Sequence, residues 1–284
     1  MNGRAATWST AVVAAATVLT ATPAAAAAPA AVPRPSTPAC GAVLTSSVRL
    51  ASDVVCPTGG GLTLAADGIE LNLNGHRLVG PGGQGRGVVV AARDAVVRNG
   101  TITGWGTGVE AGPDDPSVDT PPAVSATLRG LRVDRNTTGV RAGWEGALSV
   151  RDTWITGGGR GGESFFDGVL RLDHSVVSGN GIGLFSFSVG WDGLVVRDSV
   201  LRENSSAGLA CGQDGHYDVA RSTLQRNGSG VDAFECSGRV VDSRFVWNDR
   251  HVTGFLVDGD VMELRCNTYT RDGSPLEFPV TPCS

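Results

Sequence analysis

Apolar and polar positions recur along this chain in one pattern, with a period of 21 to 24 residues over the stretch 128–248. In each repeat an apolar residue is followed, at fixed intervals, by a small or apolar residue, a second apolar residue and usually Asn. The first apolar position holds Leu128, Val150, Leu172, Val196, Val219 and Val240, and the second holds Val133, Ile155, Val177, Leu201, Leu224 and Phe245. Between them stand Leu131, Thr153, Ser175, Ser199, Ser222 and Ser243, and the Asn position holds Asn136, Gly158, Asn180, Asn204, Asn227 and Asn248. A fixed period of this length predicts a solenoid, in which each repeat forms one turn and buries its apolar side against its neighbours.

The spacing within each repeat is typical of short β-strands. Alternation with a period of two places successive side chains on opposite faces, and the three-residue step inside each repeat shifts that alternation by one, so the chain bends there. Val, Ile, Ser and Thr dominate the repeated positions, and no stretch between them is long enough for an amphipathic helix. Leucine-rich repeats have a similar period, but Leu is too sparse here. We therefore expect stacked strands about 4.7–4.9 Å apart, with the Asn side chains hydrogen-bonded along the stack.

The repeats resemble the right-handed parallel β-helix of the pectate-lyase-like superfamily. Units such as LVVRDSVLRENSSAGLAC and VLRLDHSVVSGNGIGLFSF carry the likeness, which covers roughly residues 60–270. The segment LTLAADGIELNLNGHRLVG resembles the first coils of secreted bacterial members, and an Asn-Gly step recurs at Asn74-Gly75 and Asn99-Gly100. The resemblance implies an all-β, right-handed parallel β-helix of about eight to ten coils at this repeat length. It leaves the activity open, because the superfamily contains lyases, hydrolases, epimerases and non-enzymes.

The N-terminal segment has the features of an export signal. Arg4 is the only charged residue before Arg34, an apolar stretch runs over 11–19, and the Ala run 24–28 offers small-residue cleavage sites. A membrane anchor fits less well, because no basic flank follows. We predict a signal peptide over 1–28, a Pro-rich linker over 29–39 and one β-helix domain over 40–284, in a secreted, extracellular protein without stable membrane insertion.

Six cysteines in an exported chain indicate three disulfides. In a solenoid only neighbouring coils come close enough to be bridged. The predicted pairs are Cys40–Cys56, Cys211–Cys236 and Cys266–Cys283. The first pair flanks the first strand, the second is about one coil apart, and the third closes the C-terminal end, where an open strand edge would otherwise be exposed. A metal site at these residues would need a Cys-x-x-Cys or Cys/His spacing that the sequence lacks.

The charged residues exclude two kinds of function. All 23 basic residues are Arg, so no reaction that needs a catalytic Lys can occur. The formal net charge is −5 and the charges form no runs, which gives nucleic-acid binding no electrostatic support. The length that remains after the linker fits a single domain, which we expect to be a monomer.

A second ladder follows one turn of each coil, where the chain reads x-acid-Gly. Its acids are Glu145, Asp167, Asp192, Asp214 and Asp258, and Cys236 holds the place between the last two. Asp-Gly is favoured turn chemistry, because Gly adopts positive φ and Asp bonds its own backbone, so the ladder has a purely structural interpretation. Stacking would also bring neighbouring carboxylates within one or two strand spacings of each other, which gives it a functional interpretation.

In the functional interpretation this edge is a sugar-binding strip. Trp144 and Trp191 would form an aromatic platform, with Glu145 assisting. Only this edge combines aromatic faces with closely spaced carboxylates. Other polar rows carry opposite charges that can neutralise each other, as in Arg151-Asp152 and Arg197-Asp198.

The best candidates for catalysis are Asp192 and Asp214, with His216 as a proton carrier. Two carboxyl groups about 5–5.5 Å apart support retaining glycoside hydrolysis, and about 6.5–9.5 Å supports inversion. Close stacking of like charges would raise one pKa, as an acid catalyst requires. The same carboxylates are also suitable ligands for Ca²⁺.

Catalytic motifs of related families are absent. Polygalacturonase-like enzymes carry an Asp pair, a Gly-His-Gly and an Arg-x-Lys, and here two adjacent Asp occur only at Asp114-Asp115, within the Pro-rich insertion 111–123. Arg-x-Lys cannot occur without Lys. Two hypotheses follow: a secreted protein that binds or degrades polysaccharide as a lyase or glycoside hydrolase, and a non-catalytic extracellular structural or binding module. Fold alone does not decide between them.

Overall fold

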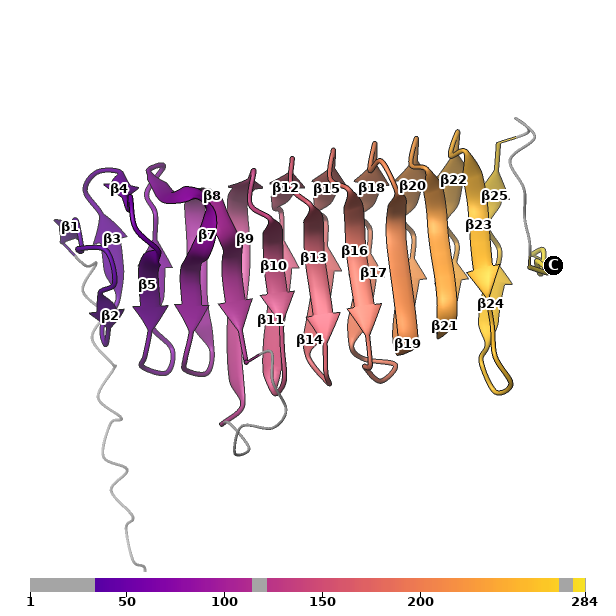
Figure 1. Ribbon diagram of the computed structural model, residues 1–284, viewed down its shortest axis with the longest axis horizontal. Coiled ribbons are helices and arrows are strands. Elements are labelled where there is room, and N and C mark those ends of the chain that lie inside the picture. Colours follow the sequence, from indigo (N-terminus) through magenta and orange to yellow (C-terminus); the bar gives the residue numbers. More distant parts are fainter. Residues whose placement is uncertain (1–33, 114–121, 271–277, 284) are drawn as a thin grey trace, which may run out of the picture. The chain divides into compact units, whose positions relative to one another are not determined.

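The computed structural model describes residues 34–113, 122–270 and 278–283, and within these residues the chain forms strands and no helix. Neighbouring strands pair in parallel, and the chain winds through about ten turns (Figure 1). The parallel β-solenoid that the repeat predicted is therefore confirmed. The predicted signal peptide lies outside the described residues, and Pro35–Ser36, at the end of the predicted linker, forms β1 and pairs with β3. In the described chain no helix is long and apolar enough to span a membrane.

Three stacked sheets make up the walls of the solenoid. The first contains β2 (Val43–Leu44), β5 (Gly60–Leu64), β10 (Thr138–Ala142), β13 (Arg160–Phe165), β16 (Ile182–Phe187) and β23 (Arg250–Phe255). The second contains β1 (Pro35–Ser36), β3 (Val48–Leu50), β6 (Glu70–Asn72), β11 (Gly146–Arg151), β14 (Val169–Asp173), β17 (Leu194–Arg197) and β24 (Met262–Arg265).

The third sheet consists of very short strands. They are β4 (Val54–Val55), β12 (Trp154–Thr156), β15 (Val176–Ser178), β18 (Val200–Arg202), β20 (Thr223–Gln225), β22 (Arg244–Val246) and β25 (Thr268–Tyr269). Five long strands bend from one sheet into the next: β7 (Arg77–Val90), β8 (Ala95–Ala111), β9 (Val124–Asp134), β19 (Ala207–Ala220) and β21 (Ser229–Val241).

The apolar positions of the repeat form the core. Both predicted rows are buried, from Leu128 to Val240 along the second sheet and from Val133 to Phe245 along the third. The opposite strand faces point outward, because alternate residues of a strand lie on opposite sides. The sequence period therefore fixes which side chains are available to a ligand: those between the core positions, on the three outer faces.

The predicted Asn ladder is also confirmed. Asn180, Asn204, Asn227 and Asn248 are buried, and each amide donates to the next, with Nδ2–Oδ1 distances of 3.1, 3.0 and 3.0 Å. Burial of these Asn and of Asn136 agrees with a structural role. Because they satisfy backbone groups inside the turn, their side chains are not free to act on a ligand.

A second polar ladder runs through the bend between the second and third sheets. Here the backbone N–H of one coil donates to a hydroxyl of the next, as from Ser175 to Ser199 Oγ at 3.1 Å and from Ser199 to Ser222 Oγ at 3.2 Å. Each hydroxyl donates in turn to a carbonyl two residues earlier, for example Ser199 Oγ to the carbonyl of Arg197 at 2.6 Å. The hydroxyls thus satisfy backbone groups that the bend removes from the strand ladder.

All three predicted disulfides are present. Their Cα–Cα distances are 5.6, 6.1 and 4.7 Å for Cys40–Cys56, Cys211–Cys236 and Cys266–Cys283. The first lies near the N-terminal end of the described solenoid and the last near its C-terminal end, where the chain after residue 277 returns to pair with β24 through Arg265 and Thr281.

Candidate functional site

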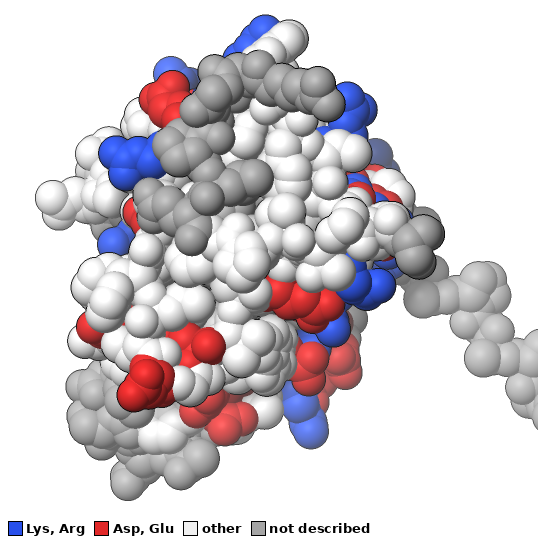
Figure 2. Space-filling view, turned by 90° about the vertical axis from the view of Figure 1, so that its right-hand side faces the viewer, with Lys and Arg blue, Asp and Glu red and all other residues white. Residues whose placement is uncertain are grey.

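The acidic turns join the first sheet to the second along one edge of the solenoid. Glu145, Asp167 and Asp214 have φ values of 56°, 59° and 57°, and all three are exposed. The left-handed residue of these turns is therefore the acid, and the expectation that the following glycine would adopt positive φ was wrong for Gly146, Gly168 and Gly215. Acidic side chains also gather in the lower half of Figure 2, the edge at which Figure 1 places these turns. The turns therefore combine backbone chemistry with an acidic surface.

The register of this ladder differs in two places from the sequence alignment. Gly215 pairs with Cys236, so Glu235, with a φ of 51°, occupies the position of the acid and Cys236 that of the glycine. The placement of Cys236 among the acids was therefore wrong. Asp192 lies in a longer turn, and its φ is not positive, in contrast to Asp214. Coil length varies at this edge because the turn, unlike the core rows, faces solvent.

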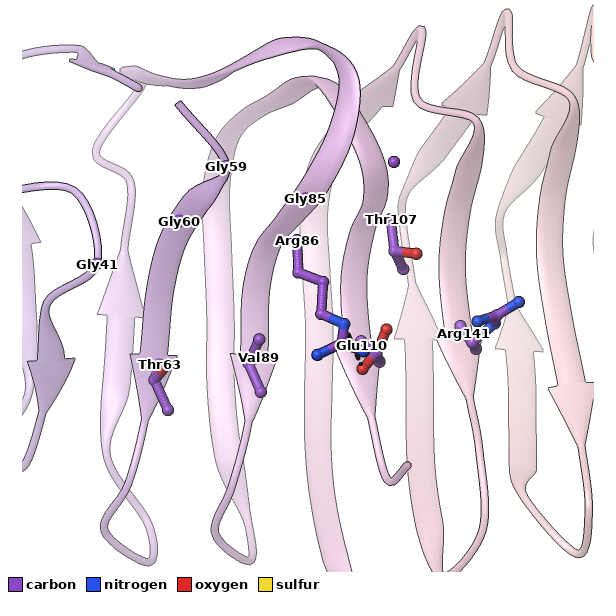
Figure 3. A pocket seen from close by; sticks show the side chains of 12 residues that line it. Gly41, Gly59, Gly60, Thr63, Gly85, Arg86, Val89, Thr107, Glu110 and Arg141 are labelled. Atoms are coloured by element: carbon purple, nitrogen blue, oxygen red, sulfur yellow. Dashed lines mark ion pairs between the residues drawn. The ribbon is translucent and has the colours of Figure 1, made fainter. Parts of the chain in front are cut away.

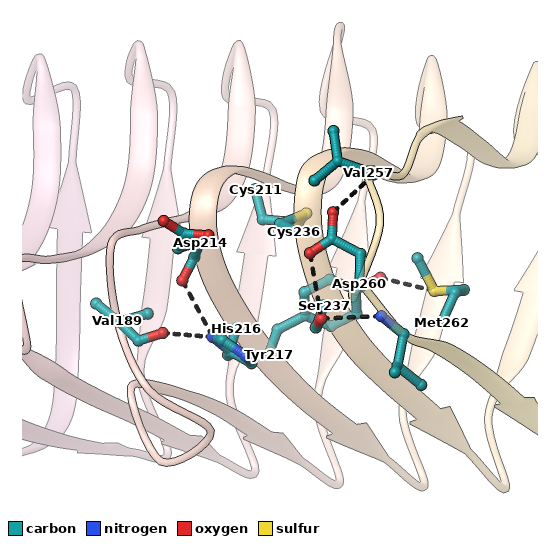
Figure 4. Close-up of a disulfide and its surroundings, with 11 residues drawn as sticks. Val189, Cys211, Asp214, His216, Tyr217, Cys236, Ser237, Val257, Asp260 and Met262 are labelled. Atoms are coloured by element: carbon teal, nitrogen blue, oxygen red, sulfur yellow. Dashed lines mark hydrogen bonds between the residues drawn. A yellow bond between two sulfur atoms is a disulfide. The ribbon is translucent and has the colours of Figure 1, made fainter.

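His216 and Trp191 come together at this longer turn, and Figure 4 shows His216 between Val189 and Asp214. The rings of His216 and Trp191 lie 4.8 Å apart, and Trp191 is 47% exposed. His216 Nδ1 lies 2.6 Å from the carbonyl of Val189 and 3.0 Å from that of Asp214, so Nδ1 carries the hydrogen and donates to these acceptors. This leaves Nε2 as the nitrogen that can exchange a proton. The structure brings Asp214 to His216 through its backbone, while Asp192 and Asp214 are both exposed.

Trp144 and Glu145 lie in another part of the edge. Glu145 and Asp167 line a groove of about 270 Å³ beside the start of β9 and β11, together with Arg93 and Asp94. Trp144 is partly buried, and its backbone N–H donates to the carbonyl of Pro113 at 2.9 Å. The predicted site residues therefore do not form one site: His216, Trp191 and Asp214 lie together, whereas Trp144 and Glu145 lie beside the Asp167 turn.

Side chains that could together ligate a metal ion lie in other parts of the described chain. Among the described residues, Asp173, His174 and Asp198 bring three ligating atoms within 4.8 Å of one another, and the other such group contains disulfide-bonded cysteines. Asp198 already accepts hydrogen bonds from Arg221 on both oxygens, at 2.9 and 2.7 Å. Neither group includes the predicted Ca²⁺ ligands Asp192 and Asp214, so binding of Ca²⁺ there stays a prediction.

The outer face of the second sheet carries a row of arginines. Arg98, Arg129 and Arg151 stand opposite one another on successive strands, β8, β9 and β11, so their backbones are about one strand spacing of 4.8 Å apart. Arg171 projects from the next strand, β14, opposite Ser149. We call these four residues the arginine face. Like charges placed directly opposite each other destabilise a sheet, so this row has an energetic cost.

The arginine face is only partly neutralised by the protein. Arg98 lies 2.7 Å from Glu70, and hydrogen bonding to Glu70 raises the pKa of Arg98. Arg129, Arg151 and Arg171 are exposed and form no ion pair with any residue in the described ranges. Three guanidinium groups are therefore available to an external anion.

Within the described chain, no ion pair joins Arg151 to Asp152 or Arg197 to Asp198, although Arg197 contributes to lowering the pKa of Asp198. Arg197 instead pairs with Asp218 at 2.5 Å, and Arg239 from the next coil binds the same carboxylate. These ion pairs join residues one coil apart, because the side chains of two consecutive residues point in different directions, whereas equivalent positions of adjacent coils lie side by side. For Asp218, burial acts to raise the pKa, but hydrogen bonds from Arg239 and Arg197 outweigh it and lower the pKa below its ordinary value.

A groove at the bend beside the arginine face adds an aromatic side chain. Its volume is about 380 Å³, and Gly130, Arg132, Asp152 and Trp154 contribute to its walls. Trp154 is 51% exposed. Gly130 directly follows Arg129, and Asp152 directly follows Arg151, so this groove borders the arginines.

Comparison with known proteins finds solved structures of similar fold. No protein-family model matches the chain, and no curated protein matches it. The receptor-binding domain of the siphovirus 9NA tailspike matches 85% of this chain at 12% identity with a TM-score of 0.48, and the chain spans 51% of that domain. The A-module of a mannuronan C-5 epimerase from Azotobacter vinelandii matches 81% of this chain and 67% of its own length, at 17% identity and a TM-score of 0.43. An alginate lyase from Paenibacillus matches 85% of this chain and 93% of its own length, at 12% identity and 0.40.

These likenesses do not indicate which residues act, so function has to be inferred from this chain. The sequence interpretation missed the arginine face, although a signal was present. The position directly after the first buried residue of each repeat reads Arg129, Arg151, Asp173 and Arg197. In a stack of parallel strands such a position becomes a row on the outer face, and charge summed along the row shows where it is unbalanced.

Proposed function

We propose that the protein is an extracellular protein that binds an acidic polysaccharide on the arginine face. The observation that carries the proposal is the in-register row Arg98, Arg129 and Arg151. Asp173 stands opposite Arg151 on the next strand, but neither Arg129 nor Arg151 forms an ion pair within the described residues. An anionic ligand relieves the repulsion along this row and forms charge-assisted hydrogen bonds with it. Three disulfides agree with an oxidising, extracellular compartment.

A linear polysaccharide suits this surface better than other anions. Its negative charges repeat along a chain, as the guanidinium groups repeat along the solenoid at about 4.8 Å. Trp154 supplies an exposed ring for packing against a sugar, and Asp152 in the same groove supplies an acceptor for hydroxyl groups. Nucleic acid is disfavoured by the net charge of −5, since binding to phosphate backbones depends on extended positive charge.

Binding to immobilised polygalacturonate and alginate, with neutral dextran as the reference, tests this proposal. The double variant Arg129→Gln, Arg151→Gln should weaken binding by about tenfold or more, because each charged hydrogen bond contributes roughly 1.5–3 kcal/mol. Arg244→Gln with Arg250→Gln is the matched control, since both are exposed and form no ion pair in the described chain. It removes the same charge from other surfaces and should leave the affinity unchanged. Equal loss in both double variants, or equal binding of dextran, would refute a specific site.

The turn around His216 is a second candidate, for cleavage of the bound chain. It is supported by the free Nε2 of His216, which lies beside the exposed Trp191 and on the same acidic edge as Asp192 and Asp214. In this proposal His216 transfers the proton, the two carboxylates act as acid and base or hold Ca²⁺, and Trp191 positions the sugar. Trp144 and Glu145 would extend the binding strip.

Cleavage is measured as new reducing ends or unsaturated products, with Ca²⁺ and with chelator. The double variant Asp192→Asn, Asp214→Asn should abolish turnover and retain polysaccharide binding, because the arginine face is unchanged. Both acids are exposed, so the free energy of unfolding should change by within about 0.5 kcal/mol. Turnover equal to wild type would exclude these carboxylates, and a wild type that binds without any turnover would identify a non-catalytic binding module.

A further inference from the structure

A groove on the first sheet, near the N-terminal end of the described solenoid, lies away from both surfaces above. Its volume is about 510 Å³, within the range of about 300–1,000 Å³ typical of ligand pockets. It spans β5, β7, β8 and β10, and Figure 3 shows its lining. Half of the lining residues are glycines, and the rest include Thr63, Thr107, Arg86 and Glu110. We call this groove the glycine terrace.

The floor of the terrace is bare backbone for a steric reason. A Cβ at Gly61 would lie 1.9 Å from the carbonyl oxygen of Gly87, and a Cβ at Gly85 would lie 2.1 Å from that of Gly59. Gly85 also has a φ of 67°. Successive coils approach closely at Gly61 and Gly85, so no side chain fits there, whereas a Cβ at Gly59 would meet nothing within 4 Å. Together the glycines leave a flat patch of peptide groups without side chains. Such a patch lets a flat ligand approach the backbone closely.

A ladder of alternating charges borders the floor. Arg86 Nε lies 2.9 Å from Glu110 Oε1, and the Glu110 side chain is only 5% exposed, whereas that of Arg86 is 54% exposed. Glu110 stands opposite Arg141, which binds Glu163 at 2.7 Å, and Arg160 binds Glu163 at 2.5 Å. Three arginines and two glutamates leave a surplus of one positive charge.

Arg86 carries this surplus at the border of the floor. Figure 3 shows its side chain extending from β7 toward Glu110, beside the glycines. Glu110 holds the guanidinium through Nε, and the terminal nitrogens of Arg86 have no further acidic neighbour among the residues described. A guanidinium held in this way is preorganised for a carboxylate, because little side-chain entropy remains to be lost.

We propose that the glycine terrace is a second saccharide site, which binds one carboxylate-bearing sugar residue. The carboxylate pairs with Arg86, the ring lies on the glycine floor, and its hydroxyls bond Thr63 and Thr107. A sugar fits better than an apolar group, since Val89 is the only large apolar side chain in the lining. The site lies on a different sheet from the arginine face and does not depend on it.

Two variants test the site without sharing a mechanism. Gly60→Tyr fills the groove: a Cβ at Gly60 would meet only Gly41, 3.5 Å from its Cα, and the φ of Gly60 is not positive. Arg86→Gln removes the charge but keeps a donor for Glu110. Thermal unfolding of both variants shows whether the fold is retained, and the Gly60 variant leaves the ion-pair ladder unchanged.

The probes are galacturonate, galactose and acetate, added to the isotope-labelled full chain and followed by amide chemical shifts. Galacturonate should shift the amides of Gly59, Gly60, Gly61 and Arg86, and both variants should weaken this binding by about tenfold. The variant with Gln at positions 129 and 151 should retain these shifts even where it no longer binds polymer, which separates this site from the arginine face.

Three results would overturn the proposal. Equal shifts with acetate and galacturonate would mean that the terrace binds a carboxylate and not a sugar. Equal shifts with galactose would show that Arg86 does not select charge. Wild-type affinity in the folded Gly60→Tyr protein would place the ligand elsewhere.

Discussion

Removal of one amide from the Asn ladder, by Asn204→Ala, tests the packing of the solenoid at a defined site. Asn204 Oδ1 accepts from the backbone N–H of Asn180 at 3.1 Å and from its Nδ2 at 3.1 Å. Asn204 Nδ2 donates to the carbonyl of Val177 at 3.3 Å and to Asn227 Oδ1 at 3.0 Å. The substitution therefore breaks four hydrogen bonds at a residue with no exposed surface.

Not all four losses count equally. Asn180 Nδ2 still donates to two backbone carbonyls, and Asn227 Oδ1 still accepts from the backbone N–H of residue 204. Two groups lose a partner: the backbone N–H of Asn180, which donates to Asn204 Oδ1, and the carbonyl of Val177, which accepts from Asn204 Nδ2. At about 1–3 kcal/mol for each of these two buried groups, we expect a loss of about 2–6 kcal/mol in the free energy of unfolding.

Urea unfolding, followed by circular dichroism and by tryptophan fluorescence, measures this loss. Ser205→Ala is the matched control, because Ser205 is the exposed neighbour of Asn204 and its hydroxyl makes no hydrogen bond in the described structure. The control should unfold like wild type. If Asn204→Ala unfolds within about 0.5 kcal/mol of wild type, the range of a neutral surface change, the ladder does not stabilise the fold as argued.

Two further predictions concern other rows. For Asp218→Asn, we expect wild type to be more stable than the variant at pH 7 and this difference to vanish as the pH falls below about 4. The pKa of Asp218 is lower in the folded than in the unfolded protein, so its carboxylate stabilises the fold above the unfolded pKa and loses this effect when it is protonated. Unfolding measured across pH 2–7 checks this, and a difference that does not depend on pH would contradict it. For Gly158→Asn, which would complete the Asn ladder, we expect the free energy of unfolding to fall by about 1–3 kcal/mol, because a Cβ there would lie 2.3 Å from the carbonyl oxygen of Asn136. Urea unfolding measures this, and a variant more stable than wild type would show that the coils can move apart to accept the side chain.

The buried part of the fold was predictable because burial imposes a period. Leu128 and its equivalents must face inward in every coil, so their spacing appears directly in the sequence. The pair Cys211–Cys236 was predictable for the same reason, since residues one coil apart on the same side become neighbours. Even Gly158, which breaks the Asn pattern, keeps the ladder connected by donating its backbone N–H to Asn180 Oδ1 at 2.9 Å.

The candidate site was less predictable because exposed turns vary in length. Alignment on x-acid-Gly assigned Cys236 to the row of acids, but pairing places it opposite Gly215. The same alignment treated Asp192 as equivalent to Asp214, although only Asp214 adopts the left-handed turn conformation. Turn residues have no buried neighbour that would enforce equal spacing, so sequence distance does not translate into spatial register there.

Charge balance along the outer rows is the step that connects this fold to binding. In a solenoid the neighbours of a charged residue lie one coil before and one coil after it, so a row can neutralise itself by alternation, as Arg197, Asp218 and Arg239 do. The row through Arg98, Arg129 and Arg151 alternates only beyond Arg151, where Asp173 stands opposite it, so the repulsion between the arginines persists in the free protein. The fold tolerates that cost because the buried rows stabilise it independently. An anionic chain lying along the row would supply the missing alternation, which is why affinity should follow the charge of this row and fall as salt screens it.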